Sequence, residues 1–549
     1  MTIESAASES RGAPPVDEYE QDAREWLANV YQGDSVRQLS VRSIVTGMLI
    51  GGVMSVSNLY VGLKTGWGLD VMITASIIAF AVYRSLEVVS ARIRRDPFTI
   101  LENYTMSSAS TAAAYMASAG LVSAIPALYL ATGLQLSAVQ IMTWLASLSV
   151  LGVFMAIPLK RQMINIDKLP FPSGMAAAET LKSIHTTGQE ALAKAYALFA
   201  GAVVGAGVKL CVELGLARDT LPLMPGERGR RWLDTTSFGF EGSLIMVGVG
   251  ALMGIRVGGS LLLGAVIYFG TIGPVLVERG IVDPVGYGRT GVNTWTLWPA
   301  TALMVAASLT SFAVRWRTVL RAFGSMASIV QGRAADDPLK RIEVPGWWFV
   351  VGTLVSGTSC VVLGEIYFGI AWWMGVIAVL FTFMLSIVAA RATGETNITP
   401  IGAMGKITQL LYGWLAPTNL TTNLMTASIT SGAAAHSADL LMDLKCGYLL
   451  GGNPRKQTIS QLFGVLAGTL VCVPAYMLVV SDPEKLGTEE LPAPAAQVWA
   501  GVAELLAKGL DNLPRGAVPA MAVGALAGVL LALAEEFAPP RVKKWIPSS

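Results

Sequence analysis

Apolar runs of about 20 residues, separated by short polar segments, follow one another along most of the chain. A run of this length spans a bilayer as an α-helix, so the pattern predicts an all-α fold, a polytopic transmembrane helical bundle of roughly 12–14 spans. Residues 1–40 are instead polar and acidic, and we expect a tail with a short helix there. The expected spans lie near residues 41–63, 67–89, 104–131, 137–159, 193–216, 242–254, 260–278, 297–314, 347–364, 371–391, 407–435, 458–480 and 516–537.

Polar residues interrupt this pattern in three places. The stretch NLYVGLKTGWGLD (58–70) lies between the first two apolar runs, where polar groups are costly. Segment 169–183 has two closely spaced prolines, and segment 416–440 is threaded with Thr, Ser and Asn. Because broken backbone survives at membrane depth only when it is buried in protein or lines a wet cavity, we interpret the last two as broken or re-entrant pore elements.

The polar stretch that begins at Asn103 is echoed at an offset of 320 residues. NYTMSSASTAAAYMAS (from Asn103) aligns with NLMTASITSGAAAHSA (from Asn423), so that Ser108 meets Ser428. Transporters built from internal repeats show such pairs, with the site at the repeat interface, and we therefore expect two pseudo-symmetric, inverted halves whose segments 103–114 and 416–436 face each other. Small-residue runs that serve only close helix packing are the alternative.

Basic residues cluster in alternate loops. Arg92, Arg94 and Arg95 follow the second run, whereas the facing loop 132–137 has no lysine or arginine. By the positive-inside rule this pattern places the N-terminus in the cytoplasm, with the chain in the cell (inner) membrane, although the arginines of loop 217–241 do not fit. The predicted organisation is a cytoplasmic tail (1–40), a first transmembrane half (41–240), a second half (241–540) and a cytoplasmic C-terminal end (541–549).

Composition removes several classes of function. The chain is 53% hydrophobic and 14% charged, whereas soluble proteins are about 25% charged, and a net charge of +2 gives no basic field for nucleic acid. The motifs GxxxxGK[ST], HExxH and GxSxG are absent, so we expect no enzyme, no resident cofactor and no metal site. The four cysteines are scattered without a CxxC pair, which predicts free thiols.

Ionisable residues bracket segment 416–440. An unpaired charge near the bilayer centre costs at least roughly 2.5–3.5 kcal/mol, so these groups must be paired, protonated or facing water. A lone buried histidine is usually a hydrogen-bonded packing residue, but His436 could also shuttle a proton or contact a metal. The bracketing residues are Glu395, Lys406, His436, Asp439, Asp443 and Lys445.

Asp439 and Asp443 are four residues apart, on one face of a helix. Like charges at this spacing disfavour ionisation of both, so one acid can be paired while the other takes up a proton. Alternatively, both acids bridge to Arg455, Lys456 or Lys445 as a static brace.

Two classes of function stay open. A secondary transporter needs broken helices and carboxylates for ion coupling, whereas a channel usually needs a pore ring supplied by an oligomer.

Four motifs resemble the oligopeptide transporter (OPT) family. They are NLYVGLKTGW (58–67), KLPFPSGMAAAETLKS (168–183), PIGAMGKITQLLYG (400–413) and SADLLMDLKCGYLLGGNPRKQ (437–457). The resemblance covers about residues 40–540 and points to a prokaryotic branch related to the yellow stripe-like metal-chelate carriers. It implies a proton-coupled symporter importing small peptides, or metal complexes of nicotianamine-like or siderophore-like chelators. The chain stops at KKWIPSS, where family members usually continue, so the sequence resembles a short or truncated form.

The expected partners are therefore the lipid bilayer, protons and a small peptide or metal chelate, with the oligomeric state open. Acids outnumber bases among the residues near membrane depth, which favours peptides. For the substrate pathway we select Asn58, Tyr60, Asn103, Tyr104, Glu179, Asn419, Asn423 and His436. For proton coupling we select Glu395, Asp439 and Asp443, and for motif or gating roles Lys64, Gly66, Pro172, Lys406, Lys445, Asn453 and Arg455.

Overall fold

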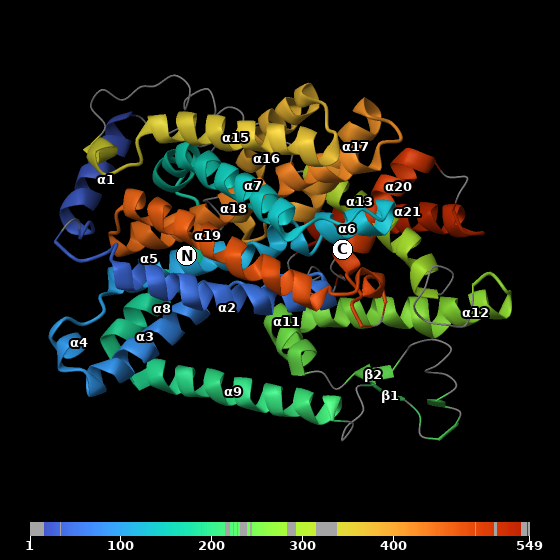
Figure 1. Ribbon diagram of the computed structural model, residues 1–549, viewed down its shortest axis with the longest axis horizontal. Helices are drawn as coiled ribbons and strands as arrows, with labels where there is room; N and C mark the ends of the chain where they lie inside the picture. The colour runs from blue at the N-terminus through green and yellow to red at the C-terminus, as the bar shows by residue number, and fades with distance from the viewer. Residues whose placement is uncertain are drawn as a thin grey trace.

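Helices make up nearly all of the structure, a computed structural model shown in Figure 1. It describes residues 16–32, 35–187, 189–214, 220–222, 224, 226–227, 229–230, 239–241, 244–282, 292–314, 338–488, 490–509, 513–539 and 546. Within these ranges, 9 helical runs are long and apolar enough to cross a membrane. The predicted all-α multi-pass membrane fold is confirmed, although these runs are fewer than the roughly 12–14 spans expected from apolar runs alone.

The helices of the first part are α1 (Val16–Asn29), α2 (Val41–Thr65), α3 (Met72–Val89), α4 (Ala91–Arg95), α5 (Ile100–Tyr115), the π-helical η1 (Ala117–Leu121), α6 (Ala124–Thr132), α7 (Ala138–Lys160), the π-helical η2 (Arg161–Ile166), α8 (Pro172–Thr187) and α9 (Gln189–Glu213). Strands β1 (Thr220–Pro222) and β2 (Gly239–Glu241) pair antiparallel. The later helices are α11 (Leu244–Ala265), the π-helical η3 (Val266–Ile272), α12 (Gly273–Glu278), α13 (Val292–Val314), the 3-10 helix η4 (Pro338–Arg341), α15 (Gly346–Phe368), α16 (Trp372–Thr396), α17 (Ile401–Leu415), α18 (Leu420–Leu450), α19 (Pro454–Val479), the 3-10 helix η5 (Pro483–Lys485), α20 (Pro494–Lys508) and α21 (Ala517–Phe537). Of the predicted C-terminal end 541–549, all but residue 546 lies outside the described residues.

Two of the predicted span boundaries are wrong. Spans 242–254 and 260–278 form one helical run from α11 to α12, because the single arginine between them is a good helix former and does not end the helix. Conversely, the predicted span 407–435 divides into α17 and α18. Thr418 adopts the left-handed conformation between them, with φ of 71°.

Segment 416–440 is not a broken helix, contrary to the prediction. Helix α18 runs for 31 residues without interruption, and the break is confined to the turn before it, where Asn419 caps the helix by accepting from the amide of Thr422. Several threonines and serines fit within α18 because their hydroxyls bond carbonyls one turn earlier in the helix. Thr426 donates to the Thr422 carbonyl at 2.7 Å, and Ser431 donates to the Ala427 carbonyl at 2.7 Å.

A short turn links α2 to α3. Gly66 ends α2 in the left-handed conformation, with φ of 78°, which glycine adopts at little cost. Asn58 then holds the returning strand of chain, donating from Nδ2 to the Leu69 carbonyl at 3.0 Å and accepting from the Leu69 amide at 2.8 Å. Residues 58–65 of the polar stretch therefore belong to α2, and residues 66–70 form a largely exposed turn that Asn58 ties back to the helix.

Small residues bring the central helices into close contact. Gly47 and Gly51 of α2 face the backbone of α5, and Gly464 of α19 faces the carbonyl of Ala109, also in α5. Gly152 of α7 faces the carbonyl of Ala433 in α18. With no side chain at these positions, the helix backbones approach one another as they do in other membrane bundles.

The two echoed stretches lie in α5 and α18, both of which are buried. The helices start at Ile100 and Leu420, again 320 residues apart, and they cross antiparallel, since Ser108 contacts Asp443 whereas Gly120 lies near Ser428. In addition, α5 packs along α19 as α18 packs along α7. Inverted halves related by a repeat would show this exchange, in which each echoed helix packs on the counterpart of the other's neighbour. The packing therefore supports the two halves, which stay a prediction.

Helix α1 lies across one end of the bundle, which we call the α1 end (Figure 1). The Trp26 ring stacks on Tyr448 near the end of α18 at a centroid distance of 4.9 Å, and its Nε1 donates to the Tyr448 carbonyl at 2.9 Å. The amide of Gln32 donates to the carbonyl of Gly451 at 3.1 Å. The region predicted as a tail therefore includes a helix that is docked on the membrane bundle.

The close contact of α7 with α18 leads to a prediction about two glycines. A Cβ added at Gly152 would overlap the Ala433 carbonyl, whereas one added at Gly207 of α9 meets nothing within 4 Å. We expect Gly152→Ala to destabilise the protein by about 1–3 kcal/mol, since overpacking forces the backbone to move. The control Gly207→Ala should leave stability unchanged or raise it by up to about 1 kcal/mol through helix propensity. Thermal unfolding of the detergent-purified protein measures both, and equal midpoints for the two variants would contradict the packing.

Candidate functional site

Asp443 of α18 lies at the centre of a buried hydrogen-bond network. Its Oδ2 accepts from Ser108 Oγ at 2.8 Å, from Thr111 Oγ1 at 2.7 Å and from Gln461 Nε2 at 2.6 Å. Gln457 Nε2 donates to Ser108 Oγ at 3.3 Å and extends the network along α19. Three helices, α5, α18 and α19, therefore supply the side chains around this one carboxylate.

Asp439 lies one turn before Asp443 and is surrounded differently. Only 2% of Asp439 is exposed, and its Oδ2 has no hydrogen-bond partner among the described residues. The same holds for both ring nitrogens of His436 and for the hydroxyl of Ser437. The ring of Tyr115 lies 6.4 Å from the His436 ring. One face of α18 thus carries several buried polar atoms that protein groups do not satisfy.

We call Asp439 and Asp443 the acid pair. Neither acid forms an ion pair with a basic residue in the described part of the chain. Two ionised carboxylates one turn apart in a medium of low dielectric constant are unfavourable, because each loses its hydration and each repels the other. The arrangement is chemically suited to holding an exchangeable proton, since Asp443 is stabilised by donors while Asp439 has a free oxygen.

Sequence features explain why this network forms here. Ser108 and Thr111 are three residues apart on α5, and Gln457 and Gln461 are four apart on α19, so each pair shares one helix face. The run of glycine and alanine at 432–435 gives α18 a surface on which α7 and η1 pack closely. The two glutamines were missed by the sequence analysis, although a glutamine pair at this spacing in an otherwise apolar run could have indicated them.

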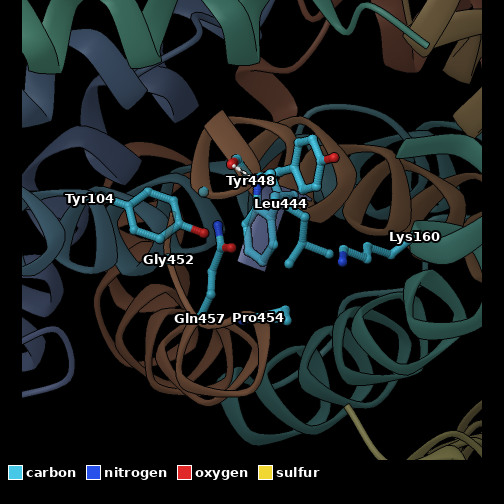
Figure 2. A pocket seen from close by; sticks show the side chains of 9 residues that line it. Tyr104, Lys160, Leu444, Tyr448, Gly452, Pro454 and Gln457 are labelled. Carbon is cyan, nitrogen blue, oxygen red and sulfur yellow. Dashed lines mark hydrogen bonds between the residues drawn. The ribbon is translucent and has the colours of Figure 1, made fainter. Parts of the chain in front are cut away.

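A small cavity lies between the acid pair and the α1 end. It is lined by residues of α1, α5, α7, α18 and α19, and it is about large enough for one water molecule. Figure 2 shows Tyr104 and Gln457 on one side of it and Lys160 on the other. The hydroxyl of Tyr104 and the Oε1 of Gln457 are buried without partners among the described residues. Since Gln457 also contacts Ser108, the cavity is one hydrogen bond away from the network around Asp443.

The predicted pathway residues do not gather in one place. His436 lies beside the acid pair and Tyr104 lines the small cavity, whereas Asn58 supports the α2–α3 turn and Tyr60 is half-buried on the same helix. Asn103 donates to the Ser76 carbonyl at 3.2 Å and lies 3.2 Å from His185 Nε2. Glu179 is exposed on α8, Asn419 is an exposed helix cap, and Asn423 is buried between α17 and α18.

Glu395, predicted to act in proton coupling, lies apart from the acid pair. Arg391 Nε bonds its carboxylate at 3.1 Å, and Arg391 Nη1 also pairs with Asp167 at 2.8 Å. The alternative of a brace on the acid pair finds no support in the geometry either. Arg455 instead donates to the backbone carbonyls of Glu343 and Lys340.

The remaining predicted motif residues shape the backbone or the helix ends. Asn453 caps α19. Its hydrogen bonds join the Arg455 amide, Tyr31 and Gln38, and they fix the start of this helix. Gly66 and Pro172 mark the end of α2 and the start of α8. Lys64 is half-buried near the end of α2. Lys445 is buried with its Nζ 6.0 Å from the Tyr448 ring centroid, and Lys406 is buried in α17.

Comparison with known proteins adds the following. The chain matches the family described as OPT oligopeptide transporter protein over residues 38–548. It is 24% identical to the "Putative oligopeptide transporter YGL114W" of Saccharomyces cerevisiae, over 87% of this chain and 83% of that protein. It is 26% identical to the "Metal-nicotianamine transporter YSL2" of Arabidopsis thaliana, over 93% of this chain and 84% of that protein.

The network around Asp443 leads to a prediction about two threonines of α5. The Thr111 hydroxyl donates to Asp443, whereas the Thr105 hydroxyl donates to the Leu101 carbonyl of its own helix. Thr111→Val should lower stability by about 1–3 kcal/mol, because it removes a donor from a buried carboxylate. The matched Thr105→Val should cost less than about 1 kcal/mol, since the backbone carbonyl keeps its helical amide partner. Thermal unfolding in detergent compares them, and equal losses would mean that Thr111 does not stabilise the carboxylate.

Proposed function

Because the chain belongs to the oligopeptide transporter (OPT) family, whose pattern it matches over residues 38–548, we propose that it is a proton-coupled symporter that imports small oligopeptides. It is a multi-pass membrane transporter, and the coupling ion, the substrate and the direction of transport are the proposal. We place it in the cell inner membrane with its N-terminus, and hence the α1 end, in the cytoplasm, because basic loops lie on that side of the predicted topology.

The acid pair is the observation that carries proton coupling. Asp439 and Asp443 are 2% and 1% exposed, share one face of α18 and have no basic partner among the described residues. A proton is the smallest species that relieves the charge of such a pair, and its gain or loss changes the free energy of every conformation that buries it. The donors around Asp443 favour its ionised form, which leaves Asp439 as the residue to be protonated.

The small cavity supports a route for the proton toward the α1 end. Gln457 lies between the cavity and Ser108, and Ser108 contacts Asp443. A single water in the cavity would find the Tyr104 hydroxyl and the Gln457 Oε1 available. Release of the proton on this side would complete import from the opposite side.

A metal-chelate symporter is the second candidate, and the names of several relatives favour it, YSL2 among them. Among the described residues no group of three or more His, Cys, Asp and Glu could hold a metal ion. A transported metal would therefore travel as its chelate, recognised through the organic ligand. A channel is the candidate of a different class. The packing of α5 on α18 within one chain favours a transporter, since a channel ring is usually supplied by an oligomer.

The acid pair predicts a difference between two carboxylate-to-amide variants in proteoliposome uptake. Asp439→Asn should fold normally, but the stimulation of uptake by an inward proton gradient should fall at least tenfold, because the exchangeable proton is lost. Asp443→Asn should keep part of the gradient dependence while losing stability, since three donors would then meet a neutral amide. The measurement is initial uptake of labelled trialanine over external pH values from about 5 to 8.

Asp482→Asn is the matched control, since Asp482 is an acid of a loop outside the membrane helices. It should leave the pH profile unchanged. Full gradient dependence in both Asp439→Asn and Asp443→Asn would refute coupling through the acid pair, and loss of folded protein in both would favour a purely structural role.

The choice of ion and substrate can be measured with the unmodified protein. Uptake of labelled trialanine should follow a proton gradient and ignore a sodium gradient of equal size. Uptake of nickel–nicotianamine in parallel tests the second candidate. Peptide uptake driven by sodium alone would overturn proton coupling, and flux of both solutes without accumulation against a gradient would indicate a channel.

A further inference from the structure

Lys406 is a buried cation away from the acid pair. It is 2% exposed on α17, and its Nζ donates to the Gly402 carbonyl at 3.3 Å. No carboxylate forms an ion pair with it in the described part of the chain. An ammonium group has three donors and a full charge, so a single bond to a carbonyl leaves most of its desolvation cost uncompensated.

The start of α17 is electrostatically unfavourable for a cation. Lys406 reaches back toward Gly402 in the first turn, near the positive end of the helix dipole. Pro400 precedes this turn and supplies no side-chain cap for its amides. The Ile401 amide donates to the Thr399 carbonyl at 2.8 Å, and the next amides of the first turn lack helical acceptors, so this helix end repels a cation and attracts an anion.

Two acceptor oxygens, one on the next turn of α17 and one on the facing helix α18, lack donors among the described residues. Gln409 Oε1 and Asn423 Oδ1 are buried without partners among the described residues. Their amide nitrogens are fixed, since Gln409 Nε2 donates to the Trp499 carbonyl at 3.0 Å and Asn423 Nδ2 donates to the Gln409 carbonyl at 2.7 Å. Because the nitrogen of each amide already meets a carbonyl acceptor, the assignment of its oxygen follows from the hydrogen bonds.

Lys406 and Gln409 share one side of α17, and Asn423 of α18 reaches this helix through its bond to the Gln409 carbonyl. Lys406 and Gln409 are three residues apart and so lie on neighbouring positions of the same helix face. Gly402, whose carbonyl accepts from the ammonium, is exposed at the start of the helix, whereas Trp499 of α20 packs on Gly405 farther along. The rise from Gly402 to Gln409 is about 10 Å, which matches the length of about three extended residues.

We propose that Lys406, the first turn of α17, Gln409 and Asn423 form a substrate site for a short zwitterion. The carboxylate of the substrate binds the Lys406 ammonium and the uncapped amides, and its protonated amine donates to the Gln409 and Asn423 oxygens. This inference rests on the proposed function, since it names how the carried substrate is recognised. Peptides and nicotianamine chelates both offer carboxylates and amines, so the recognised chemistry is shared.

The test is equilibrium binding to the full-length protein in detergent, with trialanine, trialanine amide and N-acetyl-trialanine as probes. The wild-type protein should bind trialanine at least tenfold more tightly than either blocked peptide. In Lys406→Gln the affinity for trialanine should fall at least tenfold to that of the amide, while the amide binds as before. Lys406→Arg should keep the preference for a free carboxylate.

The control is Lys485→Gln, since Lys485 lies in a loop and pairs with Glu490. It should bind all three probes as the wild-type protein does. Unchanged discrimination between trialanine and its amide in Lys406→Gln would overturn the site. If that variant does not fold, the Arg variant decides, because loss of the carboxylate preference with the charge kept would also overturn it.

Nickel–nicotianamine forms the last arm of the test. Wild-type binding of the chelate alone, lost at least tenfold in Lys406→Gln, would support the carboxylate site with a chelate as its source. The absence of wild-type binding for every probe would overturn the site. Failure of the proposed function appears separately, as binding without proton-driven uptake in proteoliposomes.

Discussion

Every polar group that this bundle carries into the membrane must find its partner within the protein, because lipid offers no hydrogen bonds. Helix α18 meets this constraint in its most demanding form, since nearly all of its residues from Thr422 to Gly447 are buried and many are polar. Thr426 and Ser431 bond carbonyls of the helix itself, and Asp443 is bonded by α5 and α19. The few atoms left without partners are therefore the informative ones.

Those unpaired atoms form two groups that would bind ligands of opposite charge. Near Asp439 and His436 the protein lacks a positive charge or a proton, whereas at Lys406 it lacks an anion. A bundle selected only for stability would place apolar side chains at such positions, since replacing buried ionic groups by well-packed apolar ones is often neutral or stabilising. The two groups are therefore more readily explained by ligands that come and go than by packing.

The sequence predicted the class of fold and part of the site, for identifiable reasons. Apolar runs mark helices that face lipid, so α2, α7 and α19 were found within a few residues. Polar α18 was misjudged because its hydroxyls satisfy themselves within the helix, which composition alone does not reveal. The acids 439 and 443 were selected from their spacing, but the partners of Asp443 come from helices distant in sequence. Glu395 was grouped with them because it is nearby along the chain, whereas its contact is with Arg391.

Coupling between a proton and a substrate requires a structural element with two conformations, and both ligands must shift the equilibrium between them. Among the described helices, α18 contributes to both groups of unpaired atoms, through Asn423 near its start and Asp439 farther along. These residues are separated by about 24 Å of continuous helix, too far for direct electrostatic coupling across a Debye length of about 10 Å if either is wetted. Transmission must then be mechanical. The glycines that α18 meets or contains, Gly152 and Gly432 among them, give it contacts without interlocking side chains, so a shift of the whole helix would change both sites together.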